Sequence, residues 1–216
     1  MKSKDTQKFT EYYRNKKVTG TYDAQREGSV YRRKKRQLEL KYFLDLLDKK
    51  SKEKVLELGC SSGFLTKHLG KVTAIDTSED MLAIAHSKNK LAKCIPGDMF
   101  ELPFKPNSFD KVVTMRVWNH LSEEDLRKAL KEVKRVLNPN GFLIFDAEEK
   151  SFPRKIASVF YKIIFNPTGY KIYQYSPSEL KQILHKEGFK IESHRFLKHK
   201  IGRQIILRTK IVNSLS

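Results

Sequence analysis

The stretch Val55-Leu56-Glu57-Leu58-Gly59-Cys60-Ser61-Ser62-Gly63 decides the fold of this 216-residue chain. Its first four residues are mostly apolar and predict a short buried strand, and the small residues that follow predict a tight loop. A helix is expected to begin near Phe64. A strand, a small-residue loop and a helix in this order bring backbone N–H groups close to a ligand, as in many sites for nucleotide-containing cofactors.

Two common kinds of nucleotide site do not fit the spacing of this loop. Gly59-x-Ser61-x-Gly63 is followed by Phe64 and Leu65, so the G-x-G-x-x-G of a dinucleotide site is not present. No Gly-Lys-Ser/Thr closes the turn, as a P-loop would require. The glycine spacing therefore disfavours an NAD-dependent dehydrogenase.

From this strand onward, strands and helices alternate with short connections, which is the pattern of a parallel sheet covered by helices on both faces. Further strands are expected over residues 72–75, 92–95, 111–114, 142–145, 189–196 and 204–211. The last two are expected to pair with each other in antiparallel fashion. The predicted fold class is α/β, a Rossmann-like doubly wound and mostly parallel sheet with an antiparallel C-terminal edge strand.

Polar residues with capping side chains mark where the helices begin. Caps are expected at Thr77 or Ser78, at Ser122, and at Ser176 or Ser178. The last of these helices is expected to end at Gly188, because glycine readily adopts the left-handed conformation that ends a helix. Asn138–Gly141 is expected to form a turn before the strand over 142–145.

The length of the chain and the lack of a repeat or linker indicate a single domain over residues 1–216. We expect four parts: a basic N-terminal arm and helix over 1–50, a central core that binds the cofactor over 51–149, an insertion or lid over 150–176, and a C-terminal helix and strands over 177–216.

Two of these parts are predicted in more detail. Residues 1–20 are expected to form a frayed arm or a short helix. The basic run Arg32–Arg36 then opens a helix, whose apolar face is expected to carry Leu38, Tyr42 and Leu46. In the insertion, an amphipathic helix over 153–165 is the candidate lid, with plain packing against the sheet as the alternative.

The net charge of +19 is concentrated at the two ends of the chain. Residues 1–50 contain 15 basic and 7 acidic residues, residues 51–149 contain 15 of each, and residues 150–216 contain 14 basic and 3 acidic residues. This distribution suits an acidic partner such as RNA, a phosphorylated metabolite or an anionic membrane surface. Solvated lysine-rich surfaces explain it equally well.

The composition also points to a cytoplasmic protein without bound metal. No run approaches the roughly 18 consecutive apolar residues of a transmembrane segment, and Met1–Asp5 does not begin a signal peptide. Two cysteines, Cys60 and Cys94, are too few for a disulfide framework or a zinc cluster. The six histidines show no metal-ligand spacing beside a carboxylate.

Three carboxylates lie in or directly after predicted strands. Asp76 comes 17 residues after Gly59, where a carboxylate can accept hydrogen bonds from both hydroxyls of a ribose. Asp98 follows the next strand, and either aspartate could instead form a helix cap or a turn. Glu57 lies inside an apolar strand, so it needs a partner such as a loop N–H or the amino group of a cofactor.

Taken in order, these segments resemble the class I S-adenosylmethionine-dependent methyltransferases, in particular the broad small-molecule group. Glu57–Gly63 is similar to the Asp/Glu-x-Gly-x-Gly-x-Gly cofactor loop of that family. The other segments that resemble the family are 74–82, 97–104, 109–113, 135–143 and 176–189. The departures are Ser61, which adds a Cβ atom where the family usually has a glycine, and Asn140, where a glycine is common.

The resemblance implies a single methyltransferase domain with S-adenosyl-L-methionine as its cofactor. The positions that it assigns to cofactor binding are Glu57, Gly59, Ser61, Gly63, Asp76, Met81, Asp98, Met99 and Arg116. In this assignment Asp98 bonds the exocyclic amine of the adenine and Met99 packs on its ring. Residues 115–120 lie where the family faces the transferred methyl group.

Methyl transfer needs few side chains, because the sulfonium of the cofactor already activates the methyl group and the enzyme mainly aligns the acceptor. His120 is the candidate catalytic base, with capping or packing as its alternative role. Trp118 is either a stacking surface for a ligand or a core residue. The chain lacks the Asn/Asp-Pro-Pro-Tyr/Phe pattern associated with amide and exocyclic-amine methylation, which disfavours those acceptors.

The predicted function is methyl transfer from S-adenosylmethionine to a small molecule, with an anionic one suited to the basic flanks. One alternative is an RNA methyltransferase that uses the basic flanks. Another is an inactive cofactor-binding subunit, for which Ser61 is the only support. The sequence leaves the acceptor atom and the oligomeric state open.

Overall fold

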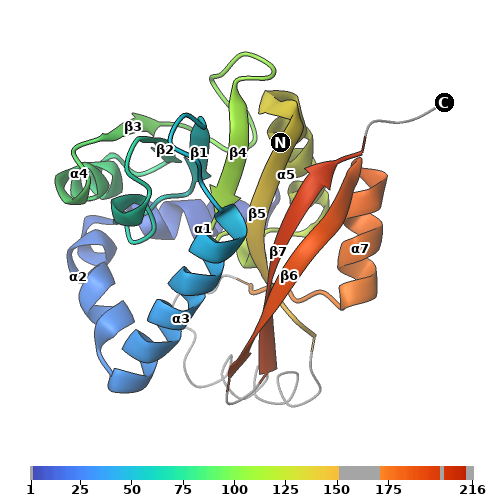
Figure 1. The fold of residues 1–216 in the computed structure, drawn as a ribbon. Helices are drawn as coiled ribbons and strands as arrows, with labels where there is room; N and C mark the ends of the chain where they lie inside the picture. Colours follow the sequence, from blue (N-terminus) through green and yellow to red (C-terminus); the bar gives the residue numbers. More distant parts are fainter. Residues whose placement is uncertain (1, 151–170, 200–201, 213–216) are drawn as a thin grey trace.

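The computed structural model describes residues 2–150, 171–199 and 202–212. Its centre is a seven-stranded sheet with the order β3-β2-β1-β4-β5-β7-β6 (Figure 1). The strands are β1 (Val55–Leu58), β2 (Val72–Asp76), β3 (Ala92–Pro96), β4 (Phe109–Thr114), β5 (Leu137–Glu148), β6 (Phe189–His199) and β7 (Gly202–Ile211). Pairing is parallel from β3 through β5, whereas β7 is antiparallel to both β5 and β6. The predicted fold class is confirmed.

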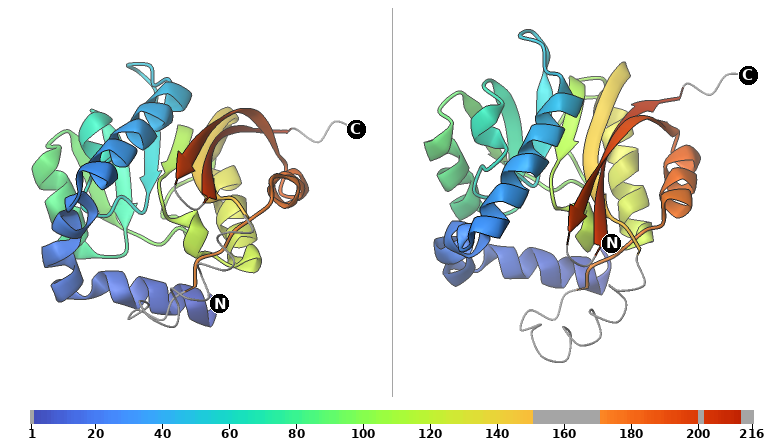
Figure 2. Two further views of the ribbon diagram at one scale, coloured as in Figure 1. Left: turned by 90° about the horizontal axis from the view of Figure 1, so that it is seen from below. Right: turned by 60° about the horizontal axis from the view of Figure 1, so that its bottom comes forward.

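Helices cover both faces of the sheet (Figure 1, Figure 2). They are α1 (Lys4–Arg14), α2 (Lys16–Glu27), α3 (Val30–Leu47), α4 (Glu79–Lys88), α5 (Glu123–Val136) and α7 (Pro177–Lys186), with short 3₁₀ helices η1 (Thr66–His68) and η2 (Trp118–His120). The apolar sides of α3 and α4 pack on one face, where Phe43 and Ala85 are fully buried. Those of α5 and α7 pack on the other, where Leu130 and Leu184 are buried.

The predicted helix caps are present. The side-chain oxygens of Ser78, Ser122 and Ser176 each accept a hydrogen bond from a backbone N–H in the first turn of α4, α5 and α7. Ser176 forms a full capping box with Glu179. Gly188 follows the end of α7 with a φ of 81°, in the left-handed region that favours glycine.

The helix expected at Phe64 is wrong. The segment after the loop forms turns and the short helix η1 instead. Gly63 and Gly70 both have positive φ angles and bracket this segment, so too few residues lie between them for regular α-helical turns. Phe64, Leu65 and Leu69 are still buried beside α3, so the segment packs as an irregular cover of the sheet.

The N-terminal region is more ordered than a frayed arm, since α1 and α2 precede the basic helix α3. The short-helix alternative for residues 1–20 is therefore the correct one for α1. The apolar face predicted for α3 is partly wrong, because Leu38 is 40% exposed. Leu46 is buried as predicted, and Leu40, Phe43 and Leu47 form the rest of the buried face.

The expected turn at Asn138–Gly141 is part of β5, where the pairing with β4 shifts register. Asn138 Nδ2 donates to Asp110 Oδ1 at 2.6 Å and holds this irregularity in place. The candidate lid helix over 153–165 lies outside the described residues. Across the described ranges, no helix has the length and apolar character needed to cross a membrane.

Candidate functional site

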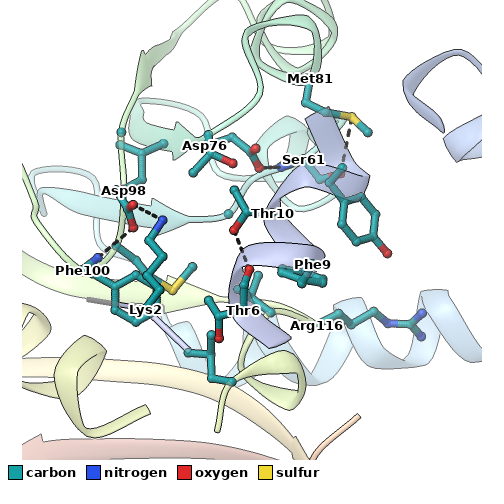
Figure 3. Close-up of a pocket in the computed structure, with 18 of the residues that line it drawn as sticks. Lys2, Thr6, Phe9, Thr10, Ser61, Asp76, Met81, Asp98, Phe100 and Arg116 are labelled. Carbon is teal, nitrogen blue, oxygen red and sulfur yellow. Dashed lines mark hydrogen bonds and ion pairs between the residues drawn. The ribbon is translucent and has the colours of Figure 1, made fainter. Parts of the chain in front are cut away.

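A cavity lies at the carboxyl ends of β1, β2, β3 and β4, beneath α1 and α2 (Figure 3). This is where the strand order changes direction around β1 and β4, the usual position of ligands in doubly wound sheets. The loops after the strands line one side with residues near 59–61, 75–77, 97–100 and 115–117. The helices line the other with Thr6, Phe9, Thr10, Tyr13 and Tyr22.

The loop after β1 brings its backbone against the cavity. Gly59 has a φ of 65°, and a Cβ atom there would lie 2.6 Å from Val117 Cγ2, so only glycine fits. Ser61 adopts a φ of 49°, a conformation that costs energy for a residue with a Cβ atom. Its Oγ lies 3.6 Å from the sulfur of Met81, which is buried and also lines the cavity.

Asp76 ends β2 and faces the cavity. Its Oδ2 accepts a hydrogen bond from Ser61 N at 2.8 Å, and its Oδ1 accepts one from Ser78 N at 3.0 Å. Burial raises the pKa of Asp76, although these backbone N–H groups act in the opposite direction. The carboxylate is thus fixed in orientation and has lone pairs left for further donors.

Asp98 lies at the opposite end of the cavity, after β3 (Figure 3). Its Oδ1 accepts a hydrogen bond from Phe100 N at 3.1 Å, and its Oδ2 forms an ion pair with Lys2 Nζ. Met99 and Phe100 follow it on the cavity wall, so an acceptor group and apolar surface lie side by side. This combination suits a planar heterocycle with an exocyclic amine.

Glu57 is the buried acid expected to need a partner. It is 2% exposed, and its Oε2 has no hydrogen-bond partner among the described residues. Burial and the nearby Asp76 raise the pKa of Glu57 to about 8, while the Thr66 hydroxyl lowers it. It borders a side pocket that shares Gly59 and Ser61 with the main cavity.

The side pocket is rich in arginine. Its lining includes Arg26, Arg36 and Arg116 together with Tyr22. Arg36 lies 3.3 Å from Glu27 Oε1 and stacks on the Phe64 ring at 3.7 Å. The guanidinium of Arg26 lies 5.0 Å from the centre of the Tyr22 ring.

Arg116 is held by a buried polar network that spans the chain. Its side chain pairs with the fully buried Glu39 at 2.6 Å, and its backbone N–H donates to Asp146 Oδ1 at 2.6 Å. Gln204 Nε2 donates to both Glu39 and Asp146. Burial and the charge of Glu39 raise the pKa of Asp146 to about 7. The φ of 60° at Arg116 is strained, and the network holds it in place.

The cavity brings together most of the predicted cofactor residues. Those on its wall are Gly59, Ser61, Asp76, Met81, Asp98, Met99 and Arg116. Glu57 lines the side pocket. Gly63 lines neither pocket. It has a φ of 78°, and a Cβ atom there would lie 2.6 Å from Ala85 Cα, so its place is the contact between the loop and α4.

His120 and Trp118 are buried away from the cavity wall. The His120 ring stacks on the Phe9 ring with 4.1 Å between ring centres. Phe9 lines the cavity, whereas His120 does not. Burial, with a smaller effect from Arg26, lowers the pKa of His120 to about 3. Trp118 packs against Phe145 at 4.6 Å, which makes it a core residue.

The residues of α1 and α2 that line the cavity were missed in the sequence. Thr6, Phe9, Thr10 and Tyr13 follow the i, i+3, i+4, i+7 spacing of one helix face, a signal that was available but is weakened by its two threonines. Nothing local predicts that this face turns toward the loops after β1 and β3. That placement follows from contacts between segments far apart in the sequence.

The sequence is similar to those of known methyltransferases. A family model described as a methyltransferase domain matches residues 56–145. A demethylmenaquinone methyltransferase of Thermotoga maritima is 28% identical over 176 residues, which cover 70% of this chain and 76% of that protein. A malonyl-[acyl-carrier protein] O-methyltransferase of Erwinia pyrifoliae is 33% identical over 118 residues, or 51% of this chain and 43% of that protein.

The fold is shared with a solved structure as well. Magnesium protoporphyrin IX methyltransferase from Synechocystis PCC 6803, solved with bound SAH, superposes with a TM-score of 0.76 at 18% sequence identity. The superposition covers 95% of this chain and 98% of that one. At this identity the likeness concerns the fold alone. Together, the methyltransferase domain model, the relatives named as methyltransferases and this shared fold support a class I S-adenosylmethionine-dependent methyltransferase.

Proposed function

We propose that this enzyme transfers a methyl group from S-adenosylmethionine to a small molecule that carries an anionic group. The observation that carries the cofactor assignment is the placement of three acids around one cavity and its side pocket: Glu57 in β1, Asp76 at the end of β2 and Asp98 after β3. Glu57 in particular keeps one buried carboxyl oxygen, Oε2, that has no hydrogen-bond partner within the described ranges and lies beside a pocket, which fits a ligand that brings a donor.

Each of the three acids has a role along the cofactor. Asp76 accepts the ribose hydroxyls, Asp98 accepts the adenine amine beside Met99, and Glu57 accepts the amino group of the methionine part. Gly59 and Ser61 allow the backbone to approach. When bound, S-adenosylmethionine supplies a methyl group that its sulfonium has already activated. The protein then has to exclude water and to align the acceptor with that methyl group.

The arginines of the side pocket support an anionic acceptor. Arg26, Arg36 and Arg116 line it together, while the Glu57 carboxyl, with its pKa near 8, is neutral at pH 7. Guanidinium groups bind carboxylates and phosphates through two parallel hydrogen bonds. The relatives named for demethylmenaquinone and magnesium protoporphyrin IX support a small-molecule acceptor in general.

His120 remains the candidate base, but its surroundings favour a positioning role. The imidazole stacks on Phe9, and a pKa of about 3 makes it a weak proton acceptor. In a base role, His120→Gln would lower kcat at least a hundredfold and remove a limb of the pH–rate profile. In a packing role, His120→Phe would retain most of the activity, because it keeps a planar ring on Phe9.

Calorimetry with S-adenosylhomocysteine, the demethylated product, tests the cofactor assignment. The wild type should bind it, and Asp76→Ala should weaken binding at least tenfold, because both an acceptor and the anchor of Ser61 are lost. Glu79→Ala, an exposed acid in the first turn of α4, is the matched control and should bind normally. Lack of binding by the wild type would contradict the proposal.

Methyl transfer from labelled S-adenosylmethionine to pairs of small acceptors tests the preference for an anionic acceptor. The two members of a pair differ only in that one carries a carboxylate or phosphate. Transfer should favour the anionic member of a pair, and Arg26→Gln should reduce that preference. Equal transfer to both members would show that the side pocket does not select an anion.

A further inference from the structure

Helix α1 forms a wall of the cavity, yet it is not part of the sheet or its layers. In Figure 2 it runs across one end of the molecule, and Figure 3 shows Thr6, Phe9 and Thr10 of α1 beside the loops that carry Asp76 and Asp98. Side-chain contacts hold α1 in this position, and one of them is made to a residue that does not line the cavity.

That contact is made by Asp125, in the first turn of α5. Asp125 is fully buried, and it does not line the cavity. Its Oδ2 accepts hydrogen bonds from Thr6 Oγ at 2.6 Å and from Ser3 N at 3.1 Å. Although burial acts in the opposite direction, the bonds from Ser3 and Thr6 hold the pKa of Asp125 below its ordinary value, so the carboxylate stays charged.

Two further contacts place the ends of α1 on the cavity rim. Lys2, just before the helix, forms its ion pair with Asp98, and Arg14 Nε in its last residue donates to the Thr77 carbonyl at 3.1 Å. Tyr173 Oη donates to Asp5 Oδ2 at 2.7 Å on the outer side. The Lys2 and Arg14 contacts join α1 to the segments after β3 and β2, which the proposed function assigns to the adenine and the ribose.

We propose that Asp125 is a positioning residue for the cofactor: it anchors the first turn of α1, and α1 so anchored completes the cofactor cavity. The inference rests on the proposed function, since it assigns the cavity to S-adenosylmethionine. Removing the carboxylate leaves the buried Thr6 hydroxyl and the half-buried Ser3 N–H without their acceptor, and an unsatisfied buried donor is costly. Without it, ligand binding has to order α1 as well, and that cost lowers affinity.

Calorimetry with S-adenosylhomocysteine on four variants tests this. Asp125→Ala and Thr6→Val should each weaken binding by about tenfold, as expected for losing a hydrogen bond to a charged group. Asp125→Asn, which keeps one acceptor oxygen, should lose less. Glu123→Ala is the matched control: it removes an acid from the same helical turn, but its side chain is exposed and its ion pair is with Arg127. It should bind like the wild type.

Thr6 itself lines the cavity, so Thr6→Val could weaken binding directly. The double variant Asp125→Ala/Thr6→Val separates such a direct effect from the loss of the contact with Asp125. If Thr6 acts through Asp125, Thr6→Val should add less than twofold in the Asp125→Ala background. A full additive loss would overturn the proposal. Should Asp125→Ala fail to fold, Thr6→Val and Asp125→Asn still provide the comparison.

Hydrogen exchange of unliganded protein gives a readout independent of activity and binding. In Asp125→Ala, amides of residues 4–14 should exchange at least tenfold faster while those of β1 and β4 stay protected; unchanged exchange in α1 would overturn the proposal. Wild-type affinity in Asp125→Ala would overturn it too, with the proposed function left intact. A wild type that does not bind S-adenosylhomocysteine would instead overturn the proposed function.

Discussion

The backbone N–H of Ser61 donates a hydrogen bond of 2.8 Å to Asp76 Oδ2, which joins the loop after β1 to the end of β2. The other carboxylate oxygen accepts from Ser78 N, the cap of α4. One side chain therefore fixes two loops of the cavity while it also faces the cavity itself. The geometry of these loops and the shape of the cavity wall are coupled through Asp76.

Replacing Ser61 with glycine should stabilise the protein. Ser61 holds a φ of 49° that is unfavourable for a residue with a Cβ atom, and glycine removes that cost at the expense of some unfolded-state entropy. We expect a gain of roughly 0.5–1 kcal/mol in the free energy of unfolding, measured by urea denaturation. Ser61→Ala is the control, because it keeps the Cβ atom; an equal gain in that variant would refute the strain argument.

Gly63 should be sensitive to substitution for a packing reason. A Cβ atom there would lie 2.6 Å from Ala85 Cα, at a φ of 78°, so Gly63→Ala should destabilise by about 3 kcal/mol. Gly20→Ala is the matched control in α2, where a Cβ atom meets nothing within 4 Å, and it should stabilise slightly. Urea denaturation measures both. If Gly63 contacts the cofactor directly, affinity for S-adenosylhomocysteine will also collapse in the folded variant.

Glu57 should make stability fall as the pH rises. The folded state keeps the proton to a pKa of about 8, whereas the unfolded chain releases it near 4.5, so between these values the folded state binds more protons. Between pH 5 and pH 9 the wild type should lose roughly 2–4 kcal/mol more stability than Glu57→Gln. Parallel stability curves for the two proteins would show that Glu57 is ionised throughout.

Cofactor binding should release the same proton. If the amino group of the ligand pairs with Glu57, the carboxyl has to ionise at pH 7, and S-adenosylhomocysteine binding should expel about one proton. Calorimetric enthalpies measured in buffers of different ionisation enthalpy give this number directly. Glu57→Gln should show none, and a wild type that also shows none would argue against the pairing.

The exposed cations of α3 allow the RNA alternative to be tested. Arg32, Arg33 and Lys34 are all exposed on this helix, outside both pockets. For a small acceptor, changing all three to glutamine should leave methyl transfer unaltered. An RNA substrate would instead bind tightly with a steep dependence on salt, and the slope would fall by about one for each phosphate contact removed.

The sequence by itself determined the strands, the helix caps and the positions of the acids. These follow from local physics: buried strands need apolar runs, Ser78, Ser122 and Ser176 satisfy the free N–H groups of their own helices, and parallel strands place their carboxyl ends together. Asp76 and Asp98 could therefore be assigned to one site from their positions after neighbouring strands. One exception was the helix expected at Phe64, because left-handed glycines on either side of the segment leave it too short. Another was the turn expected at Asn138–Gly141, which is part of β5.

Only the tertiary structure decided what closes the site and what holds it. Asp125 meets Thr6 across 119 positions of sequence, and Gln204 meets Glu39 across 165. Contacts between residues so far apart produce no periodic pattern in the sequence, because they depend on how whole helices and strands pack against one another. The same holds for His120, whose residue type suggested a base and whose burial against Phe9 gives it a neutral, packed ring.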